Sequence, residues 1–333
     1  MTKNIGVIGA GSWGTALADL LARKGYSVTL WAYEKELAAS MAVERKNALY
    51  LNQISLADNL LFTDDLERAA GAEDMVLFVP PSQVFRGLLE AARPYLHNGT
   101  LLVSASKGIE NDSLLTMAEI IREILPSSLA DKASFISGPT FALEVANQLP
   151  AAAVAACRDE EVARHVQQLF STDYFRVYTN TDVVGVELGG ALKNVMALSC
   201  GVSDGLGFGN NARAALITRG LAEITRMAVS RGAEMATLAG LAGMGDLVLT
   251  CTGGLSRNRQ VGLELGRGKS LTEILAGMKM VAEGVKTTLS AYQLAGKIGV
   301  EVPITEQMHD ILYNHKDPRQ AFNDLMLRTL KAE

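Results

Sequence analysis

The sequence has 333 residues, of which 48% are hydrophobic and 20% are charged. Because a single hydrophobic core usually stops growing at about 250 residues, we expect two domains. The formal net charge of −5 argues against broad binding to nucleic acid or anionic lipid, since both need clustered positive charge. It does not exclude an anionic small substrate, which needs only a few local basic residues.

The cysteines, the histidines and the apolar runs argue against further classes of protein, those that bind a metal and those that span a membrane. Cys157, Cys200 and Cys251 lie far apart in sequence without a CxxC pair, and the four histidines lack the spacing of a helical metal site. The apolar stretch after Lys3 is broken by glycines and charges, and no apolar run approaches the ~18 residues of a membrane span. We therefore predict a soluble, cytoplasmic protein without a metal.

The first half of the chain alternates short aliphatic runs with amphipathic segments, which favours a parallel sheet with helices on both faces. Several runs are apolar throughout, as in strands buried on both faces. The expected strands are 4–8, 27–31, 75–79, 100–104, 133–137, 151–155 and 175–178. The expected helices between them are 15–24, 34–46, 83–92 and 114–124.

Helical patterns dominate after Asp182, where strand-like runs almost vanish. The first of these helices is expected to begin with Thr181 or Asp182 as its cap and to run to about residue 203. Its glycines Gly185, Gly189 and Gly190 are costly in a helix, so they need a packing or functional reason.

The segment Gly9-Ala10-Gly11-Ser12-Trp13-Gly14 follows an expected strand and opens an expected helix, which is the context that a dinucleotide-binding GxGxxG loop requires. Gly9 permits the tight turn, Gly11 lets the backbone reach the pyrophosphate, and Gly14 permits the helix to pack on the strand. A plain turn is the alternative. We predict an α/β fold: a Rossmann-type, doubly wound, mostly parallel sheet over residues 1–180, followed by an all-helical substrate and catalytic domain over 181–333.

The end of the second expected strand bears on the choice of cofactor. NAD-specific folds commonly place an acidic residue there, against the ribose hydroxyls. In this sequence the position is taken by Trp31 to Tyr33, while Glu34 comes later and Lys35 could face a 2′-phosphate. The sequence leaves NAD and NADP open, with a preference for NADPH.

Lys193 is the best candidate for exchanging a proton with a carbonyl oxygen, because no histidine lies in a suitable context. It stands in an apolar stretch, where a lysine is costly unless something pairs with it or uses it. On helical spacing Glu187, Gly190 and Asn194 form an adjacent row. The alternative is a lysine that extends to water.

Lys107 follows an expected parallel strand, and Gly138 and Thr140 follow another. Ligands of such sheets gather beyond the carboxyl ends of the strands. Convergence of Lys107 with Lys193 there would favour proton exchange and attract an anionic substrate. Ordinary surface turns are the alternative for both segments.

Two glycine-containing segments complete the candidates. In the segment 253–260 a glycine pair precedes Ser256, Arg257, Asn258 and Arg259, which predicts a phosphate cradle at the start of a helix. Basic residues in a first turn oppose the helix dipole, so a bound anion would explain them. Asp246 lies in a loop of small residues where it could orient Lys193; a loop-capping role is the alternative.

Together these motifs resemble those of the bacterial NAD(P)-dependent glycerol-3-phosphate dehydrogenase family over nearly the whole chain. The signature runs are GAGSWGTALA from Gly9, VPPSQ from Val79, SKGIE from Ser106, SGPTFALEVA from Ser137, ELGGALKNVMAL from Glu187, GMGDLVLTC from Gly243, SRNRQVG from Ser256 and VAEGVKT from Val281. The resemblance implies reversible reduction of dihydroxyacetone phosphate to sn-glycerol 3-phosphate by NAD(P)H, which supplies phospholipid synthesis.

The resemblance also implies residue roles. Lys193 would exchange the proton, with Lys107 and Asp246 as further catalytic residues. The implied substrate-binding residues are Lys107, Gly138, Thr140, Lys193, Asn194, Asp246, Thr250, Ser256, Arg257 and Asn258. The implied cofactor-binding residues are Gly9, Gly11, Ser12, Trp13, Gly14, Tyr33, Lys107, Ala142, Arg257, Val281 and Glu283. Tyr33 departs from the family, in which many members have a basic residue at this position.

Two kinds of alternative function and the oligomeric state remain open at this point. A related 3-hydroxy acid dehydrogenase or ketopantoate reductase would need no phosphate cradle. A dinucleotide-binding sensor without catalysis would not need Lys193 and Lys107. The oligomeric state is open, with a homodimer among the options.

Overall fold

The computed structural model describes residues 3–278, 282–330 and 332, and the chain forms two compact units. Unit 1 comprises Met1–Lys107 and Leu115–Glu187, and unit 2 comprises Gly108–Leu114 and Leu188–Glu333. The chain therefore passes between the units at three points. The predicted division after residue 180 marks the change from strands to helices, whereas the packing divides the chain after Glu187.

Unit 1 is built on one sheet, which has eight strands within the described residues, in the order β3-β2-β1-β4-β5-β6-β7-β8. Neighbouring strands are parallel except β6 and β7, which pair antiparallel. The strands are β1 Asn4–Ile8, β2 Ser27–Trp31, β3 Leu60–Thr63, β4 Met75–Phe78, β5 Leu101–Ser104, β6 Ser134–Ser137, β7 Ala151–Ala156 and β8 Phe175–Asn180. The predicted doubly wound, mostly parallel sheet is confirmed.

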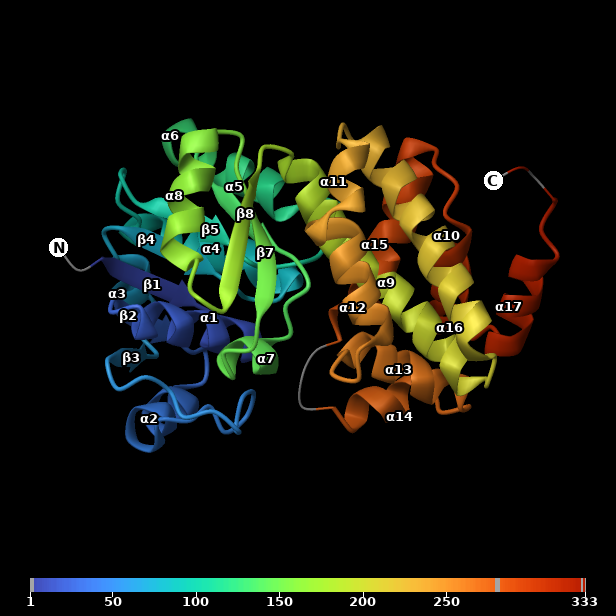
Figure 1. Cartoon of the computed structure of the whole chain (residues 1–333), viewed down its shortest axis with the longest axis horizontal. Coiled ribbons are helices and arrows are strands. Elements are labelled where there is room, and N and C mark those ends of the chain that lie inside the picture. The colour runs from blue at the N-terminus through green and yellow to red at the C-terminus, as the bar shows by residue number, and fades with distance from the viewer. Residues whose placement is uncertain (1–2, 279–281, 331, 333) are drawn as a thin grey trace. The chain divides into compact units, whose positions relative to one another are not determined.

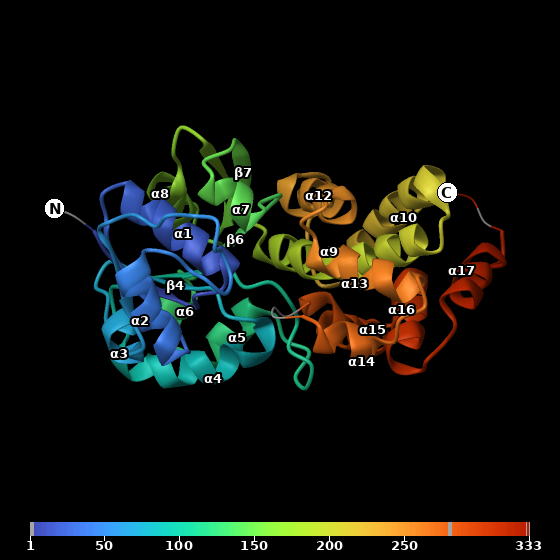
Figure 2. The ribbon, with the colours of Figure 1, turned by 90° about the horizontal axis from the view of Figure 1, so that it is seen from below.

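The sheet of unit 1 lies between two layers of helices (Figure 2). Helices α1 and α8 pack on one face, and α3, α4 and α5 follow one another along the other face. The helices are α1 Ser12–Arg23, α2 Lys35–Glu44, α3 Leu66–Ala70, α4 Ser82–Ala92, α5 Met117–Ile124, α6 Ser127–Ala130, α7 Ala142–Ala146 and α8 Glu160–Phe170, with a 3₁₀ turn at Arg93–Tyr95. Strand β4 is buried along its whole length, as its continuous apolar sequence predicts.

Differences from the predicted elements have local causes. Helix α5 starts at Met117 rather than at 114, because the Thr116 side chain and Glu119 form a capping box there. Helix α2 ends at Glu44, since Arg45 adopts a left-handed conformation with φ 55°. Strand β3 was not predicted: its four residues are neither buried throughout, as those of β4 are, nor alternately buried and exposed.

Unit 2 is helical within the described residues, as predicted, and α9 runs through its middle (Figure 1). Its elements are α9 Val183–Gly205, of which the residues up to Glu187 belong to unit 1, α10 Gly209–Ser230, α11 Met235–Ala239, a π-helical turn at Leu241–Gly245, α12 Asp246–Thr252, α13 Arg257–Gly266, α14 Leu271–Ala276, α15 Glu283–Ile298, α16 Pro303–Tyr313 and α17 Pro318–Met326. The Asp182 side chain accepts a hydrogen bond from Gly185 N at 2.8 Å, which confirms Asp182 as the cap of α9.

Helix α9 is long and apolar enough to cross a membrane by these two criteria alone, but 94% of its most apolar window is buried inside the protein. Its environment is that of a core helix. Among the described residues, α9 is the one helix that meets both criteria.

Glycines set the close packing of α9 on α13. A Cβ atom on Gly201 would lie 2.1 Å from the carbonyl oxygen of Arg259, and one on Gly262 would lie 2.0 Å from the carbonyl oxygen of Leu198. Either substitution would force the helices apart, since real Cβ atoms do not approach backbone oxygen so closely. The backbones of the two helices thus lie in direct contact.

Candidate functional site

The glycine loop of unit 1 has the geometry that its sequence predicts. Gly9 has φ +117°, a conformation that L side chains rarely adopt. A Cβ atom on Gly14 would lie 1.9 Å from the carbonyl oxygen of Gly9, so helix α1 can pack this closely only with glycine there. A Cβ atom on Gly11 would meet nothing within 4 Å, which leaves its backbone accessible to a pyrophosphate.

The start of α1 fits a dinucleotide. Gly11 is its N-cap and provides no side-chain cap, so the amides of the first turn can bind phosphate oxygens. Trp13 Nε1 is buried and has no hydrogen-bond partner among the described residues, while its ring packs on Phe175 with centroids 6.4 Å apart. Since buried N–H groups normally have an acceptor, this donor fits a ligand that brings one.

Asn47 braces the glycine loop and was missed by the sequence analysis. Its Nδ2 donates to the carbonyl oxygen of Ala10 and to Thr15 Oγ1, each at 2.8 Å, and Thr15 Oγ1 donates to the same carbonyl at 3.2 Å. Asn47 is fully buried. An asparagine after a helix normally indicates a turn, so nothing in the local sequence pointed to this contact.

The end of β2 bears on the choice between NAD and NADP. Tyr33 is 82% exposed and stands edge-on to Trp31, with ring centroids 6.3 Å apart. The carboxylate of Glu34 accepts a hydrogen bond from Tyr50 Oη at 2.9 Å. The acidic residue of this segment is thus engaged with Tyr50, an arrangement compatible with the predicted preference for NADPH.

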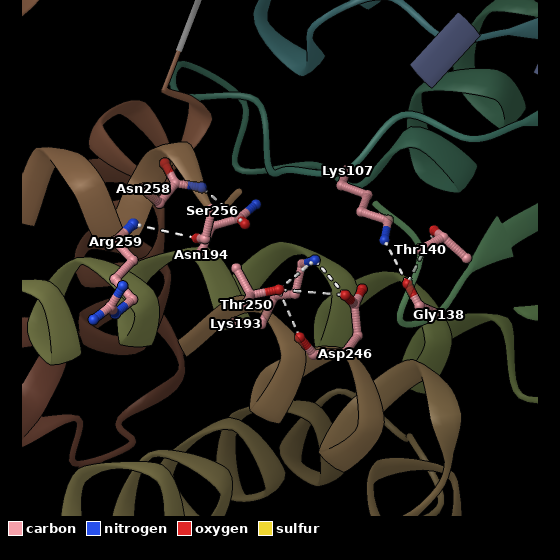
Figure 3. A network of polar contacts seen from close by, with 10 residues as sticks. All are labelled: Lys107, Gly138, Thr140, Lys193, Asn194, Asp246, Thr250, Ser256, Asn258 and Arg259. Carbon is pink, nitrogen blue, oxygen red and sulfur yellow. Dashed lines mark hydrogen bonds and ion pairs between the residues drawn. The ribbon is translucent and has the colours of Figure 1, made fainter. Parts of the chain in front are cut away.

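Lys107 and Gly138 lie beyond the carboxyl ends of the neighbouring parallel strands β5 and β6. Lys107 Nζ donates to the carbonyl oxygen of Gly138 at 3.4 Å, and Thr140 Oγ1 donates to the same oxygen at 3.2 Å (Figure 3). Gly138 has φ +147°, and a Cβ atom there would lie 2.9 Å from Ala153 Cα. The structure therefore brings these three predicted residues together.

Unit 2 holds a charged cluster of Lys193, Asp246 and Thr250, called here the Lys193 cluster (Figure 3). Lys193 Nζ donates to Asp246 Oδ1 at 2.5 Å and to Thr250 Oγ1 at 2.9 Å, and Thr250 Oγ1 donates to the carbonyl oxygen of Asp246 at 2.6 Å. The side chains of Lys193 and Asp246 are only 10% and 1% exposed. The ammonium group is oriented by a buried carboxylate, an arrangement that can hold a proton donor in place.

The loop of small residues before Asp246 explains how this acid reaches Lys193. A Cβ atom on Gly243 would lie 2.1 Å from the carbonyl oxygen of Leu238, and one on Gly189 of α9 would lie 2.6 Å from the carbonyl oxygen of Ala242. The π-helical turn Leu241–Gly245 thus packs directly on α9, and α12 starts at Asp246. Of the glycines expected to have a packing reason, Gly189 has one here.

A neutral cluster of Asn194, Asn258 and Gly284, called here the Asn194 cluster, joins α9, α13 and α15. Asn258 Nδ2 donates to Asn194 Oδ1 at 2.9 Å, and Gly284 N donates to Asn258 Oδ1 at 3.0 Å (Figure 3 shows the two asparagines). A Cβ atom on Gly284 would lie 2.8 Å from the carbonyl oxygen of Asn194. The carboxamide of Asn258 therefore positions α13 and α15 against α9.

The predicted phosphate cradle is present in part. Ser256 caps α13 as predicted, accepting from Arg259 N at 3.3 Å, and Arg257 is exposed in the first turn. Arg259 differs from the prediction: its guanidinium forms an ion pair with Asp204 at 2.6 Å, and Arg213 pairs with the same carboxylate at 2.5 Å. The guanidinium of Arg259 is thus engaged by a carboxylate that it shares with Arg213.

Four predicted cofactor residues begin helices: Ser12 begins α1, Ala142 begins α7, Arg257 begins α13 and Glu283 begins α15. Val281, also predicted to contact the cofactor, lies outside the described residues. The cofactor and substrate roles of all these residues remain predictions.

Comparison with known proteins identifies relatives over both halves of the chain. The family model of the NAD-dependent glycerol-3-phosphate dehydrogenase N-terminus matches residues 4–163, and the model of its C-terminus matches residues 182–323. A glycerol-3-phosphate dehydrogenase [NAD(P)+] of Syntrophotalea carbinolica is 61% identical over 99% of this chain and 99% of its own. One of Geobacter sulfurreducens is 60% identical over 100% of this chain and 99% of its own.

A solved structure agrees with the sequence relatives. A crystal structure of glycerol-3-phosphate dehydrogenase from Coxiella burnetii superposes with a TM-score of 0.93 at 40% identity, over 98% of this chain and 99% of that one. The likeness thus extends over the whole length in both sequence and fold.

Proposed function

Since the chain belongs to the NAD-dependent glycerol-3-phosphate dehydrogenase family, we propose that Lys193 exchanges the proton in the reaction of this family. The chain is an NAD(P)-dependent oxidoreductase that interconverts dihydroxyacetone phosphate and sn-glycerol 3-phosphate, a reaction that supplies phospholipid synthesis. A nicotinamide cofactor, when bound, would supply the hydride for the reduction and take it up in the oxidation. Lys193 donates the proton to the carbonyl oxygen in reduction and accepts it in oxidation.

The observation that carries this proposal is the Lys193 cluster. Asp246 and Thr250 fix the ammonium of Lys193, so its position does not depend on a flexible side chain. Burial removes competing water from the group and strengthens its interaction with a developing alkoxide.

We assign the remaining contacts to substrate and cofactor by their place in the family motifs. The proposed substrate-binding residues are Lys107, Gly138, Thr140, Lys193, Asn194, Asp246, Thr250, Ser256, Arg257 and Asn258. The proposed cofactor-binding residues are Gly9, Gly11, Ser12, Trp13, Gly14, Tyr33, Lys107, Ala142, Arg257, Val281 and Glu283. The guanidinium of Arg257, in the first turn of α13 after the Ser256 cap, is suited to the substrate phosphate.

Steady-state kinetics test the function directly. Addition of dihydroxyacetone phosphate to enzyme and NADPH, or NADH, is expected to consume the reduced cofactor, with the higher kcat/KM for NADPH. No consumption at high enzyme concentration with either cofactor would contradict the function. A higher kcat/KM for NADH would overturn only the preference drawn from the end of β2.

Substitution of Arg257 distinguishes a phosphorylated substrate from a 3-hydroxy acid or ketopantoate. Arg257→Ala is expected to raise KM for dihydroxyacetone phosphate at least tenfold, because a charge-assisted contact with phosphate is lost. An unchanged KM would remove Arg257 from the substrate site.

We also propose that the enzyme is cytoplasmic. Fractionation of cells that express the chain tests this location.

A further inference from the structure

A buried carboxylate outside the Lys193 cluster lies where the chain passes between the two units. Glu187 of α9 accepts a hydrogen bond from Thr116 Oγ1 at 2.8 Å and one from Ala118 N at 3.0 Å. Thr116 caps α5, and Ala118 lies in its first turn. Both oxygens of Glu187 are therefore used to hold the start of α5, and all three residues belong to unit 1.

The position of this contact along the chain is its unusual feature. The chain leaves unit 1 after Lys107, returns at Leu115 and leaves again after Glu187. Thr116 follows Leu115 directly, and Glu187 is the last residue before the chain enters unit 2. A single carboxylate thus joins the second and third passages of the chain. Lys107 precedes the first passage, and Lys193 follows the third by less than two helical turns.

We propose that Glu187 is a positioning residue for the dehydrogenase reaction. Its ionised carboxylate holds together two parts of the chain: the start of α5, where the chain returns after Lys107, and the first turns of α9, the helix that carries Lys193. The proposal rests on the roles given above to the two lysines. Among the described residues, Glu187 accepts its hydrogen bonds from Thr116 and Ala118, so its effect is on the placement of the lysines rather than on the reacting atoms.

The ionisation of Glu187 falls in the working range of an enzyme. Burial raises the pKa of this carboxyl to about 7, while the hydrogen bonds from Thr116 and Ala118 lower it. Among the described residues, the charged groups that act on it are both on α5: Glu119 raises its pKa and Arg122 lowers it. Protonation turns one oxygen into a donor, so the acid no longer accepts both bonds well. The contact is complete only above about pH 7.

Glu223 provides a matched control. It is a buried carboxylate on α10 that accepts hydrogen bonds from Ile304 N and Thr305 N, each at 2.9 Å, at the start of α16. Burial raises its pKa as well. All of these residues lie within unit 2, away from the passages of the chain. A general effect of a buried carboxylate at a helix start would therefore appear equally in both.

The first test is the dependence of kcat on pH for the parent, Glu187→Gln and Glu223→Gln. The parent is expected to exceed Glu187→Gln about tenfold at pH 8, and this ratio should fall to about two at pH 6, where only about a tenth of a group with pKa 7 is ionised. The ratio of the parent to Glu223→Gln should be the same at both pH values. A parent to Glu187→Gln ratio that does not change with pH would overturn the proposal.

The second test keeps Glu187 and removes the hydroxyl that stabilises its ionised form. Thr116→Val should move the midpoint of the kcat profile to higher pH, whereas Thr116→Ser should leave it within about 0.2 pH units of the parent. An unmoved midpoint in Thr116→Val would contradict the proposal even if Glu187→Gln fails to fold. If the parent turns over and these profiles do not differ, the proposal fails while the dehydrogenase function stands; if the parent itself does not turn over, both fail.

Discussion

Two adjacent residues of α9 lead to clusters of different chemistry. Lys193 contacts Asp246 and Thr250 of α12, where both charges are buried and paired. Asn194 contacts Asn258 of α13, which in turn holds Gly284 of α15, and this cluster has no titratable side chain. Two consecutive residues of one helix thus have different roles. The Lys193 cluster can move a proton, whereas the Asn194 cluster can only position groups.

The largest expected effect comes from removing the proton donor. Lys193→Met should lower kcat at least about 100-fold, because general acid catalysis typically contributes that much or more. It also leaves Asp246 buried without its partner, at a cost of about 3–5 kcal/mol in the free energy of unfolding.

The control for this variant is the double variant Lys193→Met, Asp246→Asn. It should recover much of the lost stability in a denaturant titration without recovering kcat. Recovery of both would mean that the loss of activity in Lys193→Met came from unfolding and not from the missing ammonium.

An intermediate effect is expected when the ammonium is kept and its orienting group is changed. Asp246→Asn should lower kcat by about 10- to 100-fold with a smaller change in KM, because the lysine remains but is no longer held by a charged acceptor. Steady-state kinetics with saturating cofactor measure both constants. An unchanged kcat would show that Asp246 stabilises the fold without taking part in the placement of Lys193.

The smallest effect is expected in the neutral cluster. Asn194→Ala removes the acceptor of Asn258 and should lower the free energy of unfolding by about 1–3 kcal/mol, the cost of leaving a buried amide unpaired. KM for dihydroxyacetone phosphate should rise up to about tenfold through misplacement of α13, while kcat changes only a few-fold. A loss in kcat as large as that of Lys193→Met would erase the distinction between the two clusters.

Much of the fold followed from local pattern. The largely apolar runs of β1, β2 and β4 predict buried parallel strands, and the glycine spacing predicts the turn at Gly9 and the packing at Gly14. Such features depend on a few consecutive residues, so the sequence contains all the information that they need.

The missed features depend on residues distant in sequence. The brace from Asn47 to Ala10, the pairing of Arg259 with Asp204 and the contact of Glu187 with Thr116 each join separate elements. Their partners are decided by tertiary packing, which one sequence without pairing information does not specify. For the same reason Arg259 was predicted to meet a bound anion, although its guanidinium pairs with Asp204 of α9, a carboxylate that it shares with Arg213.

The central claim, that the ammonium of Lys193 exchanges the proton, is tested most directly by chemical rescue of Lys193→Ala. The rate of NAD(P)H oxidation by dihydroxyacetone phosphate is measured with increasing methylammonium at constant ionic strength. The account predicts a rate at least about 100-fold below the parent, which rises with methylammonium and not with tetramethylammonium, because the latter has no proton to donate. A rate within a few-fold of the parent in the absence of any amine would contradict it.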